Sequence, residues 1–327
     1  MAECSKVLVT GATGFIGSGL VMRLSADPQW RVVASVRRQS ASSVRDVEVV
    51  QVADIGPDTD WSEALSGVDV VVHAAAIAHV RNVSAGEQLT RLRTTNVEGA
   101  LCLARQALDS GVRRFVFISS IGVNGTGAAH QPFNELSPPE PHAAYAVSKL
   151  DAECALQDLF ANTTTELVII RPPLVYAAHA PGNFKRLLRI VDLGLPLPFA
   201  RVANLRSIVS LENLVDLICC CLTHPAAANE LFVAEDGSPV STADIVWHLA
   251  AGMGKRGRLF SFPAILVALA CRALGLSGIY TQLFESLVVD GSKARRLLGW
   301  QPIVSTEAGL IQAGEAYKRM RSLKKEW

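Results

Sequence analysis

The stretch that decides the fold is "KVLVTGATGFIG", residues 6–17. It opens with "KVLVT", a short run of β-branched and apolar residues that is typical of a buried strand. Three glycines follow at Gly11, Gly14 and Gly17, and the next segment, "FIGSGLVMRLSAD", has helical character. Glycine permits a tight turn and a close approach between backbones. The stretch therefore predicts a strand, a tight turn and a helix in succession.

The same glycine-rich turn predicts a ligand. Backbone amides at the start of a helix can bind the pyrophosphate of a dinucleotide, and glycines let that ligand come close. A plain turn between strand and helix is the alternative, but the flanking elements favour dinucleotide binding. The residues predicted to contact the dinucleotide here are Gly11, Thr13, Gly14, Phe15, Ile16 and Gly17.

Apolar strands alternate with helices through the first half of the chain. This pattern indicates a parallel sheet covered on both faces, so the predicted fold is α/β, a Rossmann-type doubly wound parallel sheet. We expect a dinucleotide-binding domain over residues 1–175 and a smaller C-terminal substrate-binding lobe over residues 176–327, with segments that return to the sheet. The further strands are predicted at "RVVASV", "VEVVQV", "DVVVHAAA", "RRFVFISS" and "ELVIIRP", with long helices over residues 86–110 and from Tyr145 onward.

Composition limits the classes of function. The chain has 327 residues, 50% of them hydrophobic, and a formal net charge of +1 that gives no support for a nucleic-acid partner. Seven irregularly spaced cysteines indicate reduced thiols in a cytoplasmic protein, and no metal site is predicted. We expect no signal peptide before Lys6. The apolar run Leu259–Cys271 is shorter than the ~20 residues of a membrane span, so we interpret it as a buried helix or a subunit interface.

Two arginines stand at the predicted end of the second strand. In folds of this kind an acid at that place binds the ribose hydroxyls of NAD, whereas an arginine suits the 2′-phosphate of NADP. No Asp or Glu occurs between Pro28 and Arg45, and Arg37 and Arg38 occupy the position. A solvated loop is the alternative. The pair favours NADP(H) as the cofactor, with NAD(H) left open.

Other residues that follow predicted strands are candidates for the same crevice. Asp54, with Ile55 beside it, comes after the third strand, where a carboxylate can accept from the adenine amino group or cap a loop. The small residues Ala74, Ala75 and Ala76 end the fourth strand and would let the cofactor lie against the backbone. His79 follows them as a substrate-side candidate, although a lone histidine is more often structural.

The chemistry is predicted in "AAYAVSKL", where Tyr145 and Lys149 stand four residues apart. That spacing puts both side chains on one face of a helix. A tyrosine pKa near ~10 is too high for work at neutral pH, and a neighbouring ammonium favours the phenolate. Ser119 and Ser120 end the fifth strand, where a serine can bind the substrate oxygen that Tyr145 protonates. A turn cap is their alternative role.

With these motifs assembled, the chain resembles an extended short-chain dehydrogenase/reductase of the nucleotide-sugar epimerase/dehydratase group. The similarity covers nearly the whole chain, in the family's order: "TGATGFIG", "HAAA", "TTNVEGA", "ISSIGVNG", "YAVSK", "RPPLVY" and "SKARRLLGW". The whole-chain pattern, including "RLFSFPAILV", is most similar to bacterial O-antigen enzymes that reduce a UDP-4-keto-6-deoxy-N-acetylhexosamine at C4.

The resemblance implies roles for individual residues. Ser120 would be the catalytic serine, Tyr145 the acid–base, and Lys149 its partner and a ligand of the nicotinamide ribose. Asn96 matches the family's central-helix asparagine, and Pro172 the proline beside the nicotinamide. The family usually has a tyrosine where this chain has Asn124, which changes one pocket wall. A homodimer through the two long helices is the family's usual arrangement.

The second half of the chain carries the predictions about substrate. By resemblance, Asn183 would contact the phosphate or sugar of a UDP-sugar, and Arg206 would clamp its diphosphate. Sugar dehydratases place an Asp-Glu pair after the catalytic serine, but Ile121 and Gly122 stand there and cannot move a proton. The main prediction is therefore NADPH-dependent 4-keto reduction. The alternatives are a UDP-sugar 4-epimerase with tightly bound NAD and a non-catalytic NADP-binding regulator.

Overall fold

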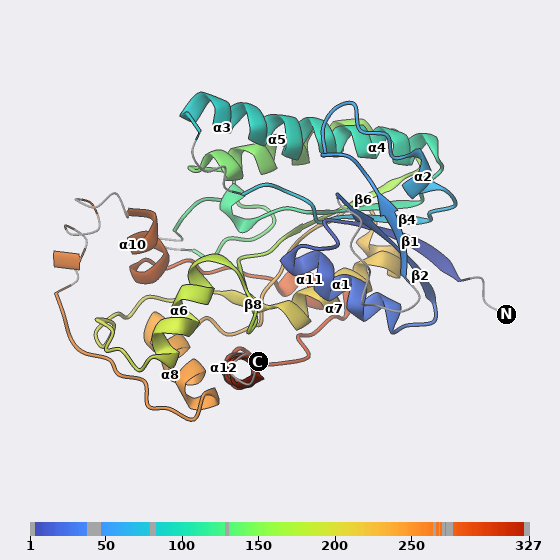
Figure 1. The fold of residues 1–327 in the computed structure, drawn as a ribbon. Coiled ribbons are helices and arrows are strands. Elements are labelled where there is room, and N and C mark those ends of the chain that lie inside the picture. The colour runs from blue at the N-terminus through green and yellow to red at the C-terminus, as the bar shows by residue number, and fades with distance from the viewer. Residues whose placement is uncertain are drawn as a thin grey trace.

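A seven-stranded parallel sheet forms the centre of the molecule (Figure 1). The strand order is β3-β2-β1-β4-β5-β6-β9, and each neighbouring pair is parallel. The strands are β1 (Ser5–Thr10), β2 (Trp30–Val36), β3 (Val47–Gln51), β4 (Val70–His73), β5 (Arg114–Ile118), β6 (Glu166–Arg171) and β9 (Leu231–Val233). This computed structural model describes residues 4–37, 47–78, 83–127, 131–263, 266–267, 269, 272 and 277–323.

The strands are apolar along their length because both faces of the sheet are covered. Val7 and Val9 of β1 point into one hydrophobic core, and Leu8 between them points into the other. Helices α1 (Phe15–Ser25), α7 (Leu211–Thr223) and α11 (Ser292–Leu298) line the first core, and α2 (Ser62–Leu65), α4 (Gly99–Asp109) and α5 (Ala144–Phe160) line the second. The predicted doubly wound parallel sheet is confirmed.

The helix predicted over residues 86–110 is divided in three. It consists of α3 (Ala85–Leu92), a π-helical segment (Arg93–Glu98) and α4. A π-turn inserts an extra residue and re-aims the side chains on either side of it. Asn96 lies within this segment, so the interruption sits where the central-helix asparagine was predicted to support the active site.

Beyond β6 the chain builds a second layer of structure. Strands β7 (Leu174–Tyr176) and β8 (Ile208–Ser210) form a separate parallel pair, while β9 joins the main sheet beside β6. A further core lies among the helices of this half. They are α6 (Gly182–Asp192), α8 (Thr242–Gly252), α10 (Ser277–Phe284) and α12 (Thr306–Leu323). The division into domains at residue 175 stays a prediction.

The apolar run Leu259–Cys271 lies in this half and is only partly within the described residues. Four of its side chains are exposed to solvent: Phe260, Phe262, Leu266 and Leu269. A buried helix, one of the two predicted explanations, is therefore wrong for the part of the run that the structure describes. Within the same described ranges, no helix combines the length and apolarity needed to cross a membrane.

Candidate active site

The glycine-rich turn between β1 and α1 has the geometry that its sequence predicts. Gly11 has a φ of +67°, and a Cβ there would lie 2.8 Å from Cα of Ala75. A Cβ on Gly17 would lie 2.1 Å from the carbonyl oxygen of Gly11. Gly14 is the N-cap of α1 and has no side chain with which to occupy the first amides. The exposed start of α1 therefore fits the phosphates of a dinucleotide.

The small residues after β4 form the wall that faces this turn. Ala75 lies against Gly11, and its backbone N–H donates to the Thr10 hydroxyl at 3.4 Å. The Asn96 amide holds the next part of the loop, because its Oδ1 accepts from the Ile77 N–H at 2.9 Å and its Nδ2 donates to the Ile77 carbonyl at 3.0 Å. The π-helical segment thus fixes the loop after β4, beside the predicted cofactor site.

Asn96 also bonds to α5, the helix that carries the predicted catalytic pair Tyr145 and Lys149. Its Nδ2 donates to the Ser148 hydroxyl at 3.0 Å, and Ser148 donates to the carbonyl of Tyr145 at 2.8 Å. One buried amide therefore joins the loop after β4 to the first turn of α5. The sequence identified Asn96 only through the family resemblance, because a π-turn leaves no periodic signal in the residues around it.

The end of β5 presents the two serines in different environments. Ser119 is buried and donates to the Glu153 carboxylate, whereas Ser120 is half-buried and accepts from the Gly122 N–H at 3.1 Å. A Cβ on Gly122 would lie 3.4 Å from Ser120 Oγ and 3.3 Å from the Cβ of Ala146. Gly122 thus lies between Ser120 and Ala146 in the first turn of α5. The substrate role predicted for Ser119 stays a prediction, and its hydroxyl already has a protein partner.

Pro172 closes the other side of this loop. Its carbonyl accepts from the Ile121 N–H at 3.0 Å, and the carbonyl of Ile170 accepts from the Ser119 N–H at 2.8 Å. The second bond joins the residue after β5 to β6, and the first continues the pairing past the end of both strands. The proline predicted beside the nicotinamide therefore shares a rigid backbone ladder with Ser120.

Tyr145 and Lys149 project from adjacent turns of α5, and burial dominates the titration of both. It raises the pKa of Tyr145 to about 12 and lowers the pKa of Lys149 to about 7, an effect that Glu153 opposes. Lys149 Nζ donates to the Ile118 carbonyl at 2.8 Å and lies 4.3 Å from the centre of the Phe117 ring. The ammonium therefore points to β5, and without a bound cofactor the predicted lowering of the tyrosine pKa does not outweigh burial.

His73 ends β4 beneath the same site. Its Nδ1 and the Thr10 hydroxyl share a hydrogen bond of 2.8 Å, and its ring stacks on Phe117 with 5.9 Å between centres. Burial, together with the nearby charge of Lys149, lowers the pKa of His73 to about 3. His73 thus joins β4 to Thr10 of β1 and to Phe117 of β5.

The sequence analysis missed a buried ion pair next to the predicted catalytic pair. Glu153 lies one further turn along α5, and Arg171 ends β6. Arg171 donates from Nε to Glu153 at 3.0 Å, makes a second, shorter bond from Nη2, and donates from Nη1 to Asn124 Oδ1 at 3.0 Å. Asn124 in turn donates to the carbonyl of Ser137 at 2.9 Å. The asparagine that departs from the family pattern is thus a fully bonded member of this network.

A signal for Glu153 was present in the sequence. Tyr145, Lys149 and Glu153 are spaced four residues apart, which continues one face of the helix. The other half of the pair carried no such signal. Arg171 is far from Glu153 in the chain, and only the packing of β6 against α5 brings the two together.

The end predicted to hold the adenosine ribose is open to solvent. Arg37 Nη1 lies 3.6 Å from Asp54 Oδ1, with side chains that are 76% and 89% exposed. Ile55 packs beside α4, where a Cβ on Gly99 would lie 2.5 Å from its Cγ2. Arg38 lies outside the described residues. Both cofactor predictions for Arg37 and Asp54 stay predictions, and the structure adds that the two side chains face each other.

The residues predicted to bind substrate are spread over the second half of the chain. Asn183 is exposed in the first turn of α6 and accepts from Arg186 at 3.5 Å. Arg206 is 8% exposed, and its guanidinium donates to the carbonyl of Glu285 at 2.9 Å. His79 lies outside the described residues. The predicted role of Arg206 as a clamp on the diphosphate stays a prediction. In this structure its Nη1 is bonded to the end of α10 instead.

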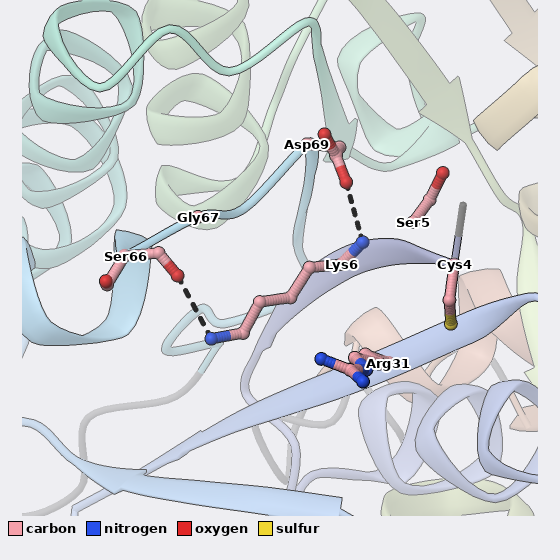
Figure 2. A pocket seen from close by; sticks show the side chains of 7 residues that line it. All are labelled: Cys4, Ser5, Lys6, Arg31, Ser66, Gly67 and Asp69. Atoms are coloured by element: carbon pink, nitrogen blue, oxygen red, sulfur yellow. Dashed lines mark hydrogen bonds between the residues drawn. The ribbon is translucent and has the colours of Figure 1, made fainter.

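A pocket of about 400 Å³ lies at the opposite edge of the sheet, at the amino ends of β1 and β2. Figure 2 shows Lys6 crossing it. Lys6 Nζ donates to the Ser66 carbonyl at 3.0 Å, and its backbone N–H donates to Asp69 at 2.7 Å. These internal bonds occupy the polar groups, and ligands of doubly wound sheets bind at the carboxyl ends of the strands instead. The pocket is therefore not the candidate site.

Known proteins with similar sequences carry names that fit this geometry. A UDP-glucose 4-epimerase from Vibrio cholerae is 41% identical over 314 residues, which cover 95% of each chain. The structure of MoeE5 in complex with UDP-glucose and NAD has a TM-score of 0.76 and 25% identity, covering 98% of this chain and 100% of that one.

The fold is shared more widely still. The structure of UDP-glucuronic acid 4-epimerase from Bacillus cereus in complex with NAD has a TM-score of 0.75 and 24% identity, over 96% of each chain. The family model described as "NAD dependent epimerase/dehydratase family" matches residues 7–234. That range contains the glycine turn, Ser120 and the pair on α5. The chain belongs to the NAD dependent epimerase/dehydratase family.

Proposed function

We propose that this protein interconverts the C4 epimers of a UDP-hexose with NAD as a bound cofactor. The proposal rests above all on the 41% identity, over 95% of both chains, to a UDP-glucose 4-epimerase. From sequence alone the NADPH-dependent 4-ketoreductase ranks first, and that finer grouping is not confirmed. The similarity to an epimerase reverses the order of the two candidates.

The residues of the site suit the transfer of a hydride and a proton at a single carbon of the sugar. The site would hold NAD at the glycine turn and beside Lys149, and a bound NAD would supply a reversible hydride acceptor for C4 of the sugar. Tyr145 takes the proton of the C4 hydroxyl and later gives it back, so that the carbon–hydrogen bond and the oxygen–hydrogen bond are both restored. Ser120 holds the same oxygen, and the Lys149 ammonium stabilises the phenolate form of Tyr145.

The phenolate requires help that the free site does not supply. Burial raises the pKa of Tyr145 to about 12, which keeps the side chain a neutral phenol in the ligand-free protein. A cationic nicotinamide beside the ring would favour the phenolate in the same way as Lys149. The base would therefore form only when oxidised cofactor is in place, which couples proton removal to the presence of a hydride acceptor.

Dehydration is disfavoured by packing as well as by residue type. Ile121 is 5% exposed and belongs to a small apolar cluster with Val233, Leu287 and Val289. A carboxylate at position 121 would be buried in that cluster at a large energetic cost. At Gly122 even a Cβ would contact Ser120 and Ala146. The acid and base that a dehydratase needs therefore have no place after Ser120.

The second candidate is reduction of a UDP-4-keto sugar with NADPH. Arg37, which follows β2, is the observation in its favour, because a guanidinium there suits a 2′-phosphate. Asp54 lies 3.6 Å from that guanidinium, and its carboxylate would repel the same phosphate. The third possibility, a regulator that only binds NADP, needs none of Ser120, Tyr145 and Lys149.

The test compares the two reactions on one preparation. Protein as purified, with no added cofactor, should convert UDP-glucose or UDP-N-acetylglucosamine into its 4-epimer, followed by proton NMR of the sugar. The Tyr145→Phe variant is the control for contaminating epimerase. The proposal is wrong if the 4-epimers do not form while UDP-4-keto-6-deoxy-N-acetylhexosamine consumes NADPH stoichiometrically. In that case the product gains one hydride and one proton, and the enzyme is the reductase.

A further inference from the structure

A group of exposed aromatic, aliphatic and basic side chains lies at the end of the molecule that carries α6 and α8 (Figure 1). Trp247 and Leu195 are each 49% exposed, Phe262 is 44% exposed and Phe260 is 42% exposed. Arg256 and Arg258 are exposed in the same segment. We call these six residues the lobe-tip surface.

The six residues form one continuous surface although they come from three parts of the chain. Two backbone hydrogen bonds of Leu197 join the segment after α6 to residues 258–260. The Leu197 N–H donates to the Arg258 carbonyl, and the Leu197 carbonyl accepts from the Phe260 N–H, each at 2.9 Å. A Cβ on Gly257 would lie 2.6 Å from Cδ1 of Trp247. Backbone pairing and close packing therefore hold the surface together.

Its aromatic side chains are arranged to stay exposed. The rings of Phe260 and Phe262 meet edge to face, with 6.2 Å between their centres, so they contact each other more than the core. Monomeric proteins rarely leave a contiguous apolar patch facing water unless a partner covers it. We therefore expect a binding partner to cover the lobe-tip surface.

The charges near the lobe-tip surface indicate which kind of partner it binds. Residues 182–202 and 253–272 contain eight basic residues and a single acidic one, Asp192, whereas the whole chain has a net charge of only +1. Asp192 is itself engaged by Lys255 and Arg321. The region thus combines a local excess of positive charge with exposed aromatic and aliphatic side chains. That combination is characteristic of protein surfaces that lie on anionic membranes.

A second copy of this chain fits the surface less well. A two-fold interface brings the same patch of each subunit together. Here it would bring four arginines, two from each subunit, into one interface, and like charges gathered there oppose association. An anionic lipid surface instead offers phosphates to the arginines and a boundary layer in which Trp247 and the phenylalanines are stable.

We propose that the lobe-tip surface docks this protein onto a bilayer of anionic phospholipid. Trp247, Phe260 and Phe262 enter the headgroup boundary, and Arg256 and Arg258 contact lipid phosphates. Docking by this surface would hold the protein at the membrane without a spanning segment. The proposal does not depend on which reaction the active site performs.

The experiment measures co-sedimentation of the full chain with phospholipid vesicles. Vesicles that contain phosphatidylglycerol should carry the protein down, and vesicles of phosphatidylcholine alone should carry much less. Replacing both Arg256 and Arg258 by Gln should weaken binding to the anionic vesicles roughly 30-fold, as expected when two basic side chains leave such a surface. The matched control is the pair Arg23→Gln and Arg31→Gln, which removes equal charge from exposed positions near α1 and β2 and should leave binding unchanged.

The apolar part is tested by a second pair of variants. Changing Phe260 and Phe262 to Ser should weaken vesicle binding at high salt, where electrostatic attraction is screened. Replacing the exposed Met22 and Leu136 by Ser is the control. Equal binding to both kinds of vesicle, or binding that survives all lobe-tip variants, overturns the proposal. Failure to bind vesicles, with a change of oligomeric state in the phenylalanine variant, would identify the surface as a subunit contact instead.

Discussion

The two ends of the predicted cofactor site differ in how their side chains are held. At the catalytic end Lys149 and Glu153 are each 1% exposed, and Asn96, Arg171 and Asn124 are bonded to neighbours on other elements. At the predicted adenosine end, the Arg37 guanidinium pairs with Asp54, and both side chains are mostly in solvent. Buried hydrogen bonds fix the side chains at the first end, whereas the second end carries an exposed charge on a loop.

This contrast has a physical consequence for how each end tolerates change. Polar groups buried without water must keep every partner, so removing one leaves others unsatisfied. An exposed ion pair in water contributes about 0–1 kcal/mol, and its loss is compensated by solvent. Substitutions at the catalytic end should therefore affect folding and turnover strongly. Substitutions at the adenosine end should alter only the choice between cofactors.

The largest effect is expected from Tyr145→Phe. The change removes the hydroxyl that transfers the proton and keeps the ring, which α5 already holds. Turnover should fall about 10²- to 10⁴-fold, the usual range for loss of a general acid–base, while cofactor affinity changes little. Steady-state rates and a binding titration on the same preparation check both parts. Near-normal turnover in this variant would remove Tyr145 from the mechanism.

The buried ion pair should give the next largest effect. Glu153→Gln leaves Arg171 with its charge buried and its partner neutral, so the free energy of unfolding should fall by about 3–5 kcal/mol, measured by urea denaturation. Asp151→Asn, on the exposed face of the same helix, is the control and should change stability little. An equally small change in Glu153→Gln would mean that the pair does not hold α5 to β6.

The same variant makes a prediction about pH. Burial lowers the pKa of Lys149 to about 7, and Glu153 opposes that effect. With a neutral Gln at position 153 the pKa of Lys149 should fall further, so the ammonium is lost at a lower pH. If turnover needs the charged lysine, its decline on the alkaline side should move to lower pH. An unchanged pH profile, with stability reduced, would assign Glu153 a purely structural role.

The contrast between the two ends also explains what the sequence could reveal. The glycine turn and the strands were predictable because local patterns specify them: Gly11 and Gly17 are required by contacts within a few residues or with the neighbouring strand. The partners of Glu153 were not predictable, because Arg171 reaches it only after β6 has joined the sheet beside β5. The π-helical turn at Asn96 was missed for a related reason, since the partner of Asn96 is Ile77, which lies in the loop after β4 and is distant in the chain.

The smallest effect is expected at the adenosine end, and it decides how the cofactor is chosen. Replacing Arg37 and Arg38 by Ala should leave NAD binding within a few-fold of the original, because Arg37 is exposed and paired only with Asp54. NADP binding should weaken more, by several-fold to about 10²-fold, since a charge-assisted bond to the 2′-phosphate is worth about 1.5–3 kcal/mol.

Asp54→Asn is the opposite change: it removes the carboxylate that would face that phosphate, and NADP binding should tighten. Calorimetric titration of both cofactors against the three proteins measures the difference directly. Equal weakening of NAD and NADP, or none, would show that the two arginines are solvated loop residues and that cofactor choice resides elsewhere in the crevice.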